Sequence, residues 1–595
     1  MAEATSSTSR ATSSIDLIER AAAGRPPPID RMPRPSFKRM VEMRDNARLA
    51  TWGWLPVDRR GPYPAILFRT PYREDLLGWM RMDPLRYRDA GYAVVFQLIR
   101  GIGESEGAFE FANPLDRSDG FDTIEWVAAQ PWCTGAVGMD GSSYVGMTQI
   151  AAAIEQPPSL RCIVPAVVSS DFFNDVPRYG GIVSRQHTLG WTQFTYKDSL
   201  ADLTPGLWGA QAFLANPAAW PLLLSRPALA AADGVLEHDA LAHYREVLTR
   251  ETFDDWWAAR TFSPSDYARV AVPTMVVTGL FDGSMGSQIL WRMLEEHAPA
   301  EVERRLVIGP WDHGQAYVGG AAYGPYRFEG LDGFDLQSAR LAFFDRHLRG
   351  EGAGPRLAGR VSSYLLGADR WLGMAAYPDP AVSLCPLYLA SDGPANLRGN
   401  GRLVELPRAS DAADAFEVDP ELPFVPVGRS LDPKLALDLR ETERQEDVLV
   451  YTGEPLAAPL TLHGEFAVEL HLSADVPDCD IVCWLARVPP DGRTTQLSVG
   501  MLRARYRHGF DRTVLLTPGE PVAVRVAMAH VGITLAPGDR LRLLIGGTLF
   551  PLLDPNPHDG GPTATAAAVR RARQVIHHGV AHPSRVLLPA REEES

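Results

Sequence analysis

Two stretches of alternating strand and helix patterns, separated by a long segment of different character, constrain the fold of this chain most. In the first stretch, the apolar runs at 63–70 and 91–100 predict buried strands, and the periodic apolar positions at 119–130 predict a helix. The alternation resumes with another strand pattern at 272–282. Strand and helix in regular succession are typical of an α/β domain built on a doubly wound parallel sheet.

The rest of the chain divides into segments of distinct composition. The segment between the two α/β stretches is rich in tryptophan, alanine and leucine and predicts a helical cap. After Gly354, short alternating segments separated by Pro, Gly and Asp turns predict an all-β domain of sandwich or jelly-roll type. We therefore expect a flexible N-terminal arm at 1–28 and an α/β core in two parts, at 29–169 and 268–354. A helical cap at 170–267 is inserted between these two parts, and a β jelly-roll domain follows at 355–595.

A candidate nucleophile lies between a predicted strand and a predicted helix, in the sequence GSSYVG at 141–146. This is the context of the nucleophile elbow of α/β-hydrolases, although the second glycine comes one residue later than in G-x-S-x-G. With Gly141 two positions before it, Ser143 rather than Ser142 takes the strained turn. The alternative is a Gly/Ser turn that only caps a helix.

An acid and a histidine follow in the order that this fold uses. Asp282 ends the strand pattern VVTGLFD, and His313 follows the strand pattern LVIGPWD. Asp312 is a weaker candidate for the acid, because neighbouring side chains on an extended segment diverge. We therefore predict a catalytic triad of Ser143, Asp282 and His313.

An oxyanion hole needs two hydrogen-bond donors. The backbone N–H of Tyr144, the residue after the nucleophile, is one. The loop after the first strand reads Arg69-Thr70-Pro71-Tyr72, without a glycine run, so the phenol of Tyr72 is the candidate for the second. A packing role for Tyr72 is equally compatible with its position.

Composition excludes several classes of function. A formal net charge of −15, without a basic cluster, argues against nucleic-acid binding. The chain has no apolar segment typical of a signal peptide or membrane span, so we expect no membrane association and a cytoplasmic location. Cys479 and Cys483 lack a second ligand pair, and we expect neither a metal nor an organic cofactor. Homo-oligomer formation is left open.

These motifs together resemble the cocaine-esterase and X-prolyl dipeptidyl-peptidase group of α/β-hydrolases. The resemblance runs from residue 35 to 590 and includes RGIGESEG at 100–107, GLFDG at 279–283, GPWDHG at 309–314 and AHPSRVLLP at 581–589. It implies a hydrolase core, a helical cap and a C-terminal jelly roll, and it implies the oxyanion role for Tyr72.

The chain departs from the group at two places. Leu98 stands where an aspartate is common in the group. The missing carboxylate would have been a local polar partner, and Arg100 is the candidate residue that loses it. Amino-ester hydrolases of the group also hold the substrate's ammonium with acidic residues, partly just after the triad aspartate, whereas Gly283-Ser284-Met285 follows here. Asp171 is then the one remaining carboxylate for that role, and a lone exposed carboxylate gains little from a solvated ammonium. Specificity for α-amino substrates is therefore not expected.

The predicted function is that of a serine hydrolase whose partner is a small-molecule ester with a hydrophobic acyl or aryl group. Cap side chains would line an apolar pocket; the candidates are Asp171, Phe172, Phe173 and Trp191. An amidase, an acylase or an X-Pro dipeptidyl-peptidase of the same fold is the nearest alternative. A non-catalytic binding protein is the alternative from another class.

Overall fold

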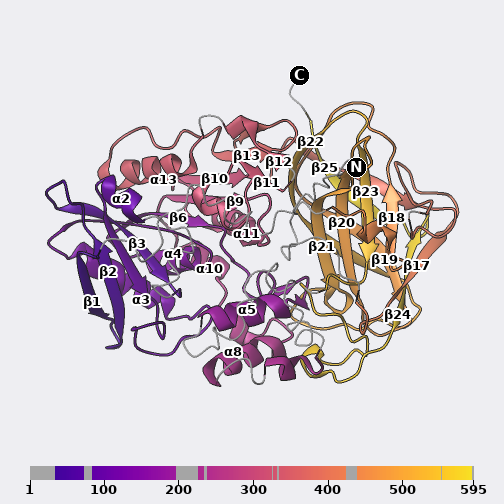
Figure 1. The fold of residues 1–595 in the computed structure, drawn as a ribbon, viewed down its shortest axis with the longest axis horizontal. Coiled ribbons are helices and arrows are strands. Elements are labelled where there is room, and N and C mark those ends of the chain that lie inside the picture. Colours follow the sequence, from indigo (N-terminus) through magenta and orange to yellow (C-terminus); the bar gives the residue numbers. More distant parts are fainter. Residues whose placement is uncertain are drawn as a thin grey trace, which may run out of the picture.

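The computed structural model describes residues 34–72, 84–195, 225–232, 238–324, 326–331, 334–397, 399–423, 438–550 and 552–592. The arm predicted at 1–28 lies outside these residues, as does part of the predicted cap. In Figure 1 the α/β core and the β domain lie side by side, and helices α5 and α8 lie along one edge of the molecule, between them. Within the described ranges, no helix combines the length and the apolar character needed to cross a bilayer.

The core is built on a ten-stranded sheet in the order β1-β2-β4-β3-β5-β6-β9-β10-β13-β14. The strands from β4 to β13 run parallel, and β1, β2 and β14 add antiparallel edges. This confirms the predicted doubly wound sheet. The bounds are β1 Phe37–Glu42, β2 Arg48–Trp54, β3 Tyr63–Thr70, β4 Ala93–Leu98, β5 Cys133–Ser142, β6 Leu160–Ala166, β9 Thr274–Gly279, β10 Arg304–Gly309, β13 Val361–Leu365 and β14 Arg370–Met374.

Two strands beyond the expected boundary at residue 354 pair with the core sheet. We expected the core to end at residue 354, but β13 pairs in parallel with β10, and β14 pairs with β13. The core sheet therefore continues to Met374. Short alternating strands look alike in an α/β edge and in a β domain, so the pattern alone did not separate them.

Helices cover both faces of the sheet. On one face, α3 and α4 pack on the central strands, and every residue of α4 is buried. On the other face, Asp140 of β5 accepts a hydrogen bond from Tyr87 of α2 at 2.5 Å and forms a buried ion pair with Arg340 of α13. The bounds are α2 Pro84–Asp89, α3 Asp116–Ala128, α4 Tyr144–Ile154, α11 Gly286–His297, α12 Gln315–Val318 and α13 Leu336–Phe344, which a π-turn, η6, continues over Asp345–Arg349. A small hairpin and a 3₁₀ turn precede α13: β11 Ala322–Tyr323, β12 Tyr326–Arg327 and η5 Glu329–Leu331.

The described part of the inserted segment is mostly helical. Its elements are β7 Arg178–Tyr179, β8 Ile182–Val183, α5 Arg185–Thr195, η4 Ala228–Ala232, α8 His238–Thr249, α9 Asp255–Ala258 and α10 Pro264–Tyr267. It packs against the β domain as well as the core: the backbone N–H of Phe253 donates to the carbonyl of Phe510, and that of Arg503 donates to the carbonyl of Gly180. The cap is thus held between the two domains.

The C-terminal part is β-rich, as predicted. Eleven strands form one hydrogen-bonded sheet system in which β22 pairs with β19 beside the main path. The strands are β15 Val382–Ala390, β16 Arg402–Val404, β17 Ala412–Val418, β18 Val448–Thr452, β19 Leu460–Ala474, β20 Asp480–Val488, β21 Thr495–Arg503, β22 Val522–Leu535, β23 Arg540–Gly546, β24 Ala572–His578 and β25 Arg585–Arg591. Its described helical turns are the 3₁₀ turns η7 Thr442–Arg444, η8 Ala504–Tyr506 and η9 Thr563–Thr565.

Candidate active site

Ser143 occupies a strained turn between β5 and α4. Its φ of 59° and ψ of −128° lie in a region that L residues rarely adopt, and its backbone N–H donates to the carbonyl of Ala166 at 2.9 Å. Gly141 has a φ of 142°, and a Cβ there would lie 2.2 Å from Val145 Cγ1. Ser142 instead ends the strand, opposite Ala166 in β6. The geometry of a nucleophile elbow is therefore present, and it belongs to Ser143.

Asp282 and His313 come together beyond the carboxyl ends of β9 and β10. The Nδ1 atom of His313 lies 2.9 Å from Oδ1 of Asp282. Asp282 is buried, with 1% of its side chain exposed, whereas 47% of the His313 side chain is exposed. Asp312 accepts a hydrogen bond from the backbone N–H of Gln315 at 2.7 Å and so helps to start α12. The acid that contacts the imidazole is thus Asp282.

The Tyr72 phenol meets the elbow. Burial raises the pKa of this phenol, and hydrogen bonds with the Ser143 side chain, the Trp191 side chain and the Tyr144 backbone act against the rise. Because the indole N–H is the one polar group of a tryptophan side chain, Trp191 donates to the phenol oxygen. The phenol proton can then be donated elsewhere. The two predicted oxyanion donors, Tyr72 and Tyr144, therefore converge beside Ser143.

Two of the four predicted pocket residues join an aromatic cluster at this site. Trp191 stacks on Tyr144, with centroids 6.1 Å apart, and meets Phe111 edge-on at 5.4 Å. Phe172 packs on Phe111 at 5.7 Å and on Phe262 at 5.7 Å. Phe172 also lines a small cavity along α4, but no triad residue is among the described residues that line this cavity.

The other two predicted pocket residues have different surroundings. Phe173 packs against Trp257 at 5.5 Å and against Phe510 of the β domain at 5.6 Å, so it belongs to the contact between cap and β domain. Oδ1 of Asp171 accepts hydrogen bonds from the backbone N–H groups of Phe173 and Asn174, each at 3.1 Å. This carboxylate therefore stabilises a local turn.

Sequence reasoning missed Asp175, which supports the loop after Asp282. Its carboxylate accepts a hydrogen bond from the backbone N–H of Met285 at 2.7 Å and one from Ser284 Oγ at 2.8 Å. Burial raises the pKa of Asp175 to about 6, and these hydrogen bonds act against the rise. Its position in SSDFFND was visible in the sequence, but nothing there linked it to a loop more than a hundred residues away.

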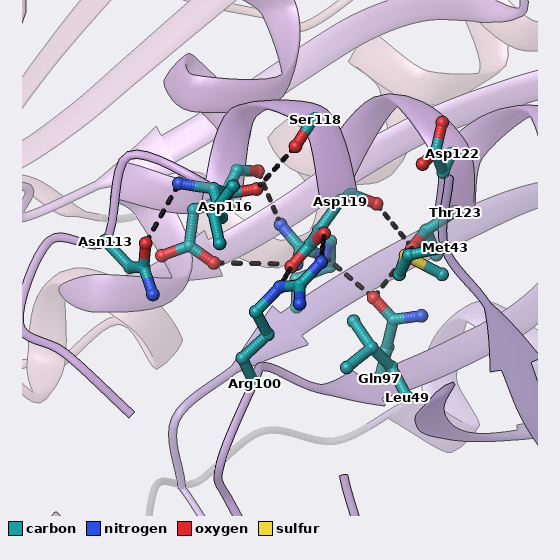
Figure 2. A network of polar contacts seen from close by, with 12 residues as sticks. Met43, Leu49, Gln97, Arg100, Asn113, Asp116, Ser118, Asp119, Asp122 and Thr123 are labelled. Atoms are coloured by element: carbon teal, nitrogen blue, oxygen red, sulfur yellow. Dashed lines mark hydrogen bonds and ion pairs between the residues drawn. The ribbon is translucent and has the colours of Figure 1, made fainter. Parts of the chain in front are cut away.

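A buried polar network stabilises the loops behind the elbow (Figure 2). Figure 2 shows the Arg100 guanidinium against the Asp119 carboxylate, and the two N–O contacts are each 2.7 Å. Arg100 also contacts Asp45 at 2.8 Å, so it has carboxylate partners although position 98 is a buried leucine. One turn earlier on α3, Asp116 accepts a hydrogen bond from the Tyr144 hydroxyl at 3.0 Å. The network thus reaches Tyr144, the residue that follows Ser143.

The described residues contain no group of three His, Cys, Asp or Glu side chains arranged to hold a metal ion. A strained serine, an imidazole bonded to a buried carboxylate and two converging donors are the parts needed for acyl transfer.

Comparison with known proteins supports this interpretation. Residues 45–315 match the X-Pro dipeptidyl-peptidase (S15 family) model, and residues 356–587 match the X-Pro dipeptidyl-peptidase C-terminal non-catalytic domain. The chain is 31% identical over 583 residues to a cocaine esterase from Rhodococcus sp. (strain MB1 Bresler), covering 92% of this chain and 97% of that protein. It is 26% identical over 587 residues to a putative serine esterase from Mycobacterium bovis, covering 85% and 89%.

Solved structures agree on the fold. An α-amino acid ester hydrolase superposes with a TM-score of 0.80 at 24% identity, covering 99% of this chain and all of the other. An aminopeptidase from the marine sediment archaeon Thaumarchaeota archaeon superposes with a TM-score of 0.79 at 25% identity, covering 94% and 98%. The chain belongs to the X-Pro dipeptidyl-peptidase (S15) family and is a serine ester hydrolase with an α/β-hydrolase core and a C-terminal β domain.

Proposed function

We propose that this enzyme cleaves esters with a hydrophobic acyl or aryl group through an acyl-enzyme on Ser143. The observation that carries the proposal is the strained backbone of Ser143, which directly follows β5. In the same parallel sheet, β9 and β10 lead to Asp282 and His313, which contact each other. Strain of this kind persists where surrounding structure enforces it and is common at catalytic nucleophiles.

The reaction proceeds in two steps. His313 removes the proton from the Ser143 hydroxyl as its oxygen attacks the ester carbonyl, and then gives that proton to the leaving alcohol. Asp282 accepts the Nδ1–H bond of His313, so Nε2 is the nitrogen that exchanges the proton. Water activated by the same imidazole then attacks the acyl-enzyme and releases the acid.

Tyr72 and Tyr144 stabilise the tetrahedral oxyanion. The Tyr72 O–H and the Tyr144 backbone N–H converge beside Ser143, and the indole of Trp191 holds the phenol oxygen. Because Trp191 fills an acceptor position of that oxygen, the phenol proton is directed away from the indole. Donors oriented before the reaction stabilise charge that develops in the transition state at little further cost.

The surroundings favour an apolar acyl group. Trp191, Phe111 and Phe172 form the aromatic cluster next to Tyr144. No carboxylate follows Asp282 directly, and the two nearby acids, Asp171 and Asp175, accept hydrogen bonds from the protein. A substrate ammonium group would therefore compete with existing bonds, which disfavours α-amino substrates and amine-anchored peptides.

A covalent labelling experiment tests the nucleophile. We expect a fluorophosphonate probe to label the wild type and the Ser142→Ala variant, and not the Ser143→Ala variant. Melting temperatures of both variants check that they fold. Labelling of Ser143→Ala together with loss of labelling in Ser142→Ala would refute the assignment.

An amidase uses the same triad and differs in how the leaving group is protonated. Turnover of an aryl ester beside the matching anilide separates the two activities. We expect kcat/KM for the ester to exceed that for the anilide beyond the difference in their uncatalysed rates. A faster anilide reaction would favour the amidase.

A further inference from the structure

A buried carboxylate lies directly before the strained turn at Ser143. It belongs to Asp140, which precedes Gly141 in the sequence and has no exposed side-chain surface. Oδ1 of Asp140 accepts a hydrogen bond from the backbone N–H of Gly141 at 2.8 Å, and Oδ2 accepts one from the Tyr87 hydroxyl at 2.5 Å. This carboxylate therefore contacts the backbone of the turn itself and ties it to helix α2.

Arg340 of helix α13 joins this carboxylate to the segment that follows His313. Its Nη1 atom donates to Oδ1 of Asp140, and its Nη2 atom donates to the backbone carbonyl of Ala316 at 3.2 Å. The guanidinium also lies over the ring of Tyr317, 4.9 Å from the centroid. The last two contacts are made with helix α12, so one buried guanidinium joins β5 to α12.

Helix α12 in turn is bonded to the backbone on either side of His313. The carbonyl of Asp312 accepts a hydrogen bond from the backbone N–H of Ala316 at 2.9 Å, and its carboxylate accepts one from that of Gln315 at 2.7 Å. His313 lies between these bonded residues and contacts Asp282 at 2.9 Å. A displacement of the first turn of α12 would therefore also displace the imidazole.

Stability alone does not account for charged residues at this place. Neither side chain of the Asp140–Arg340 pair is exposed, and a buried ion pair is often no more stable than apolar side chains of similar volume. What the pair adds is direction. A guanidinium donates through a rigid planar fork, so it fixes the geometry between its two acceptors, here a carboxylate in β5 and a carbonyl in α12.

We propose that Asp140 and Arg340 are positioning residues that set the distance between the Ser143 hydroxyl and the His313 imidazole. This inference rests on the proposed function and extends it to residues behind the site. The two side chains act through the backbone of Gly141 and of α12, not through the substrate. A misplacement of about 1 Å between reacting groups lowers a rate on the order of 10²-fold.

The test replaces the whole network with apolar side chains, in the variant Tyr87→Phe/Asp140→Val/Arg340→Met. Because no buried charge is left unpaired, we expect a melting temperature close to that of the wild type. The kcat for an aryl ester should fall on the order of 10- to 100-fold, and the rate constant of fluorophosphonate labelling should fall with it. Both are measured well below the melting temperature, where a change that affects only stability leaves the folded fraction, and therefore both rates, unchanged.

The π-turn that continues α13 offers a matched control with the same three residue types. The Tyr92 hydroxyl donates to Oδ1 of Asp345 at 2.6 Å, and Arg349 donates to the same oxygen at 2.7 Å. Arg349 also donates to the carbonyl of Ala90 at 2.9 Å. Since Tyr92 directly precedes β4, this network lies at the amino ends of the parallel strands, whereas the candidate site lies at their carboxyl ends. The control variant Tyr92→Phe/Asp345→Val/Arg349→Met should leave kcat and the labelling rate unchanged.

Two outcomes would overturn the positioning role: wild-type kcat and labelling rate in the folded apolar variant, or equal losses in the control variant. If the apolar variant does not fold, Arg340→Lys makes the decision, because it keeps a charge opposite Asp140 but replaces the planar fork with a single ammonium group. We expect a lowered kcat in this variant, and a wild-type kcat would again overturn the proposal. Absence of labelling in the wild type instead refutes the acyl-enzyme on Ser143, on which this inference rests.

Discussion

Removing the hydroxyl of Tyr72 tests the oxyanion hole with the loss of a single oxygen atom. Tyr72→Phe keeps the buried ring, which is 3% exposed, and takes away the contacts with Ser143, Trp191 and the Tyr144 backbone. Loss of one donor to the oxyanion lowers kcat by about 10²–10³-fold, or about 3–4 kcal/mol in the activation barrier. Since the ground-state carbonyl gains less from this donor than the oxyanion does, KM should change little.

The assay is steady-state hydrolysis of an aryl ester, with the burst of released alcohol recorded to separate acylation from deacylation. Tyr144→Phe is the matched control, because it removes a hydroxyl from the neighbouring tyrosine and leaves its backbone N–H in place. That hydroxyl donates to buried Asp116 at 3.0 Å, so this variant should lose about 1–3 kcal/mol of stability. Its kcat should stay within about threefold of that of the wild type, because its hydroxyl donates to Asp116 and not to the oxyanion.

Two results would refute this reasoning. A Tyr72→Phe variant with a kcat close to that of the wild type would mean that the second donor lies elsewhere. Equal losses in both variants would mean that the aromatic hydroxyls act through stability of the site rather than through the oxyanion.

Three further predictions concern buried carboxyl groups. Asp554→Asn leaves the buried Arg185 cation without its counter-charge and should lower the free energy of unfolding by about 3–5 kcal/mol, measured by urea titration. Burial raises the pKa of Asp116 to about 6 in the folded state, so the folded chain keeps this proton at a pH where the unfolded chain has released it. The contribution to stability is therefore largest below about pH 4 and is lost as the pH rises through about 6. Asp116→Asn should remove this pH dependence from the free energy of unfolding, measured by urea titration at several pH values. Asp175→Ala releases the loop beyond Asp282 and should lower kcat on the order of 10- to 100-fold, measured with an aryl ester, whereas an unchanged kcat would show that the loop holds its position without Asp175.

The part of the site that could be predicted from sequence is the part that local backbone rules determine. A glycine two residues before Ser143, a strand before it and a helix after it specify an elbow within a few residues. Asp282 and His313 each follow a strand pattern, and the order of strands in a parallel sheet brings their carboxyl ends to one edge.

The cap could not be predicted at the same level, because its side chains are positioned by contacts from distant segments. Phe172 and Phe173 are neighbours of the same type in the sequence, yet Phe172 joins the cluster near Tyr144, and Phe173 packs on Phe510. Their different contacts, with Phe111 and with Phe510, come from segments far away in the sequence.

The β domain carries none of the predicted triad residues, yet it holds a helix that contacts the candidate site. The buried pair of Arg185 and Asp554 joins it to the first turn of α5, and the same helix carries Trp191, which contacts the Tyr72 phenol. A buried ion pair of this kind is costly to break, because the remaining charge stays desolvated. Movement of α5 away from the β domain would therefore be opposed by several kcal/mol, by order of magnitude. Since the same helix contacts Tyr72, the proposed oxyanion donor, substitutions at its junction with the β domain should lower turnover, although they lie outside the core that supplies Ser143.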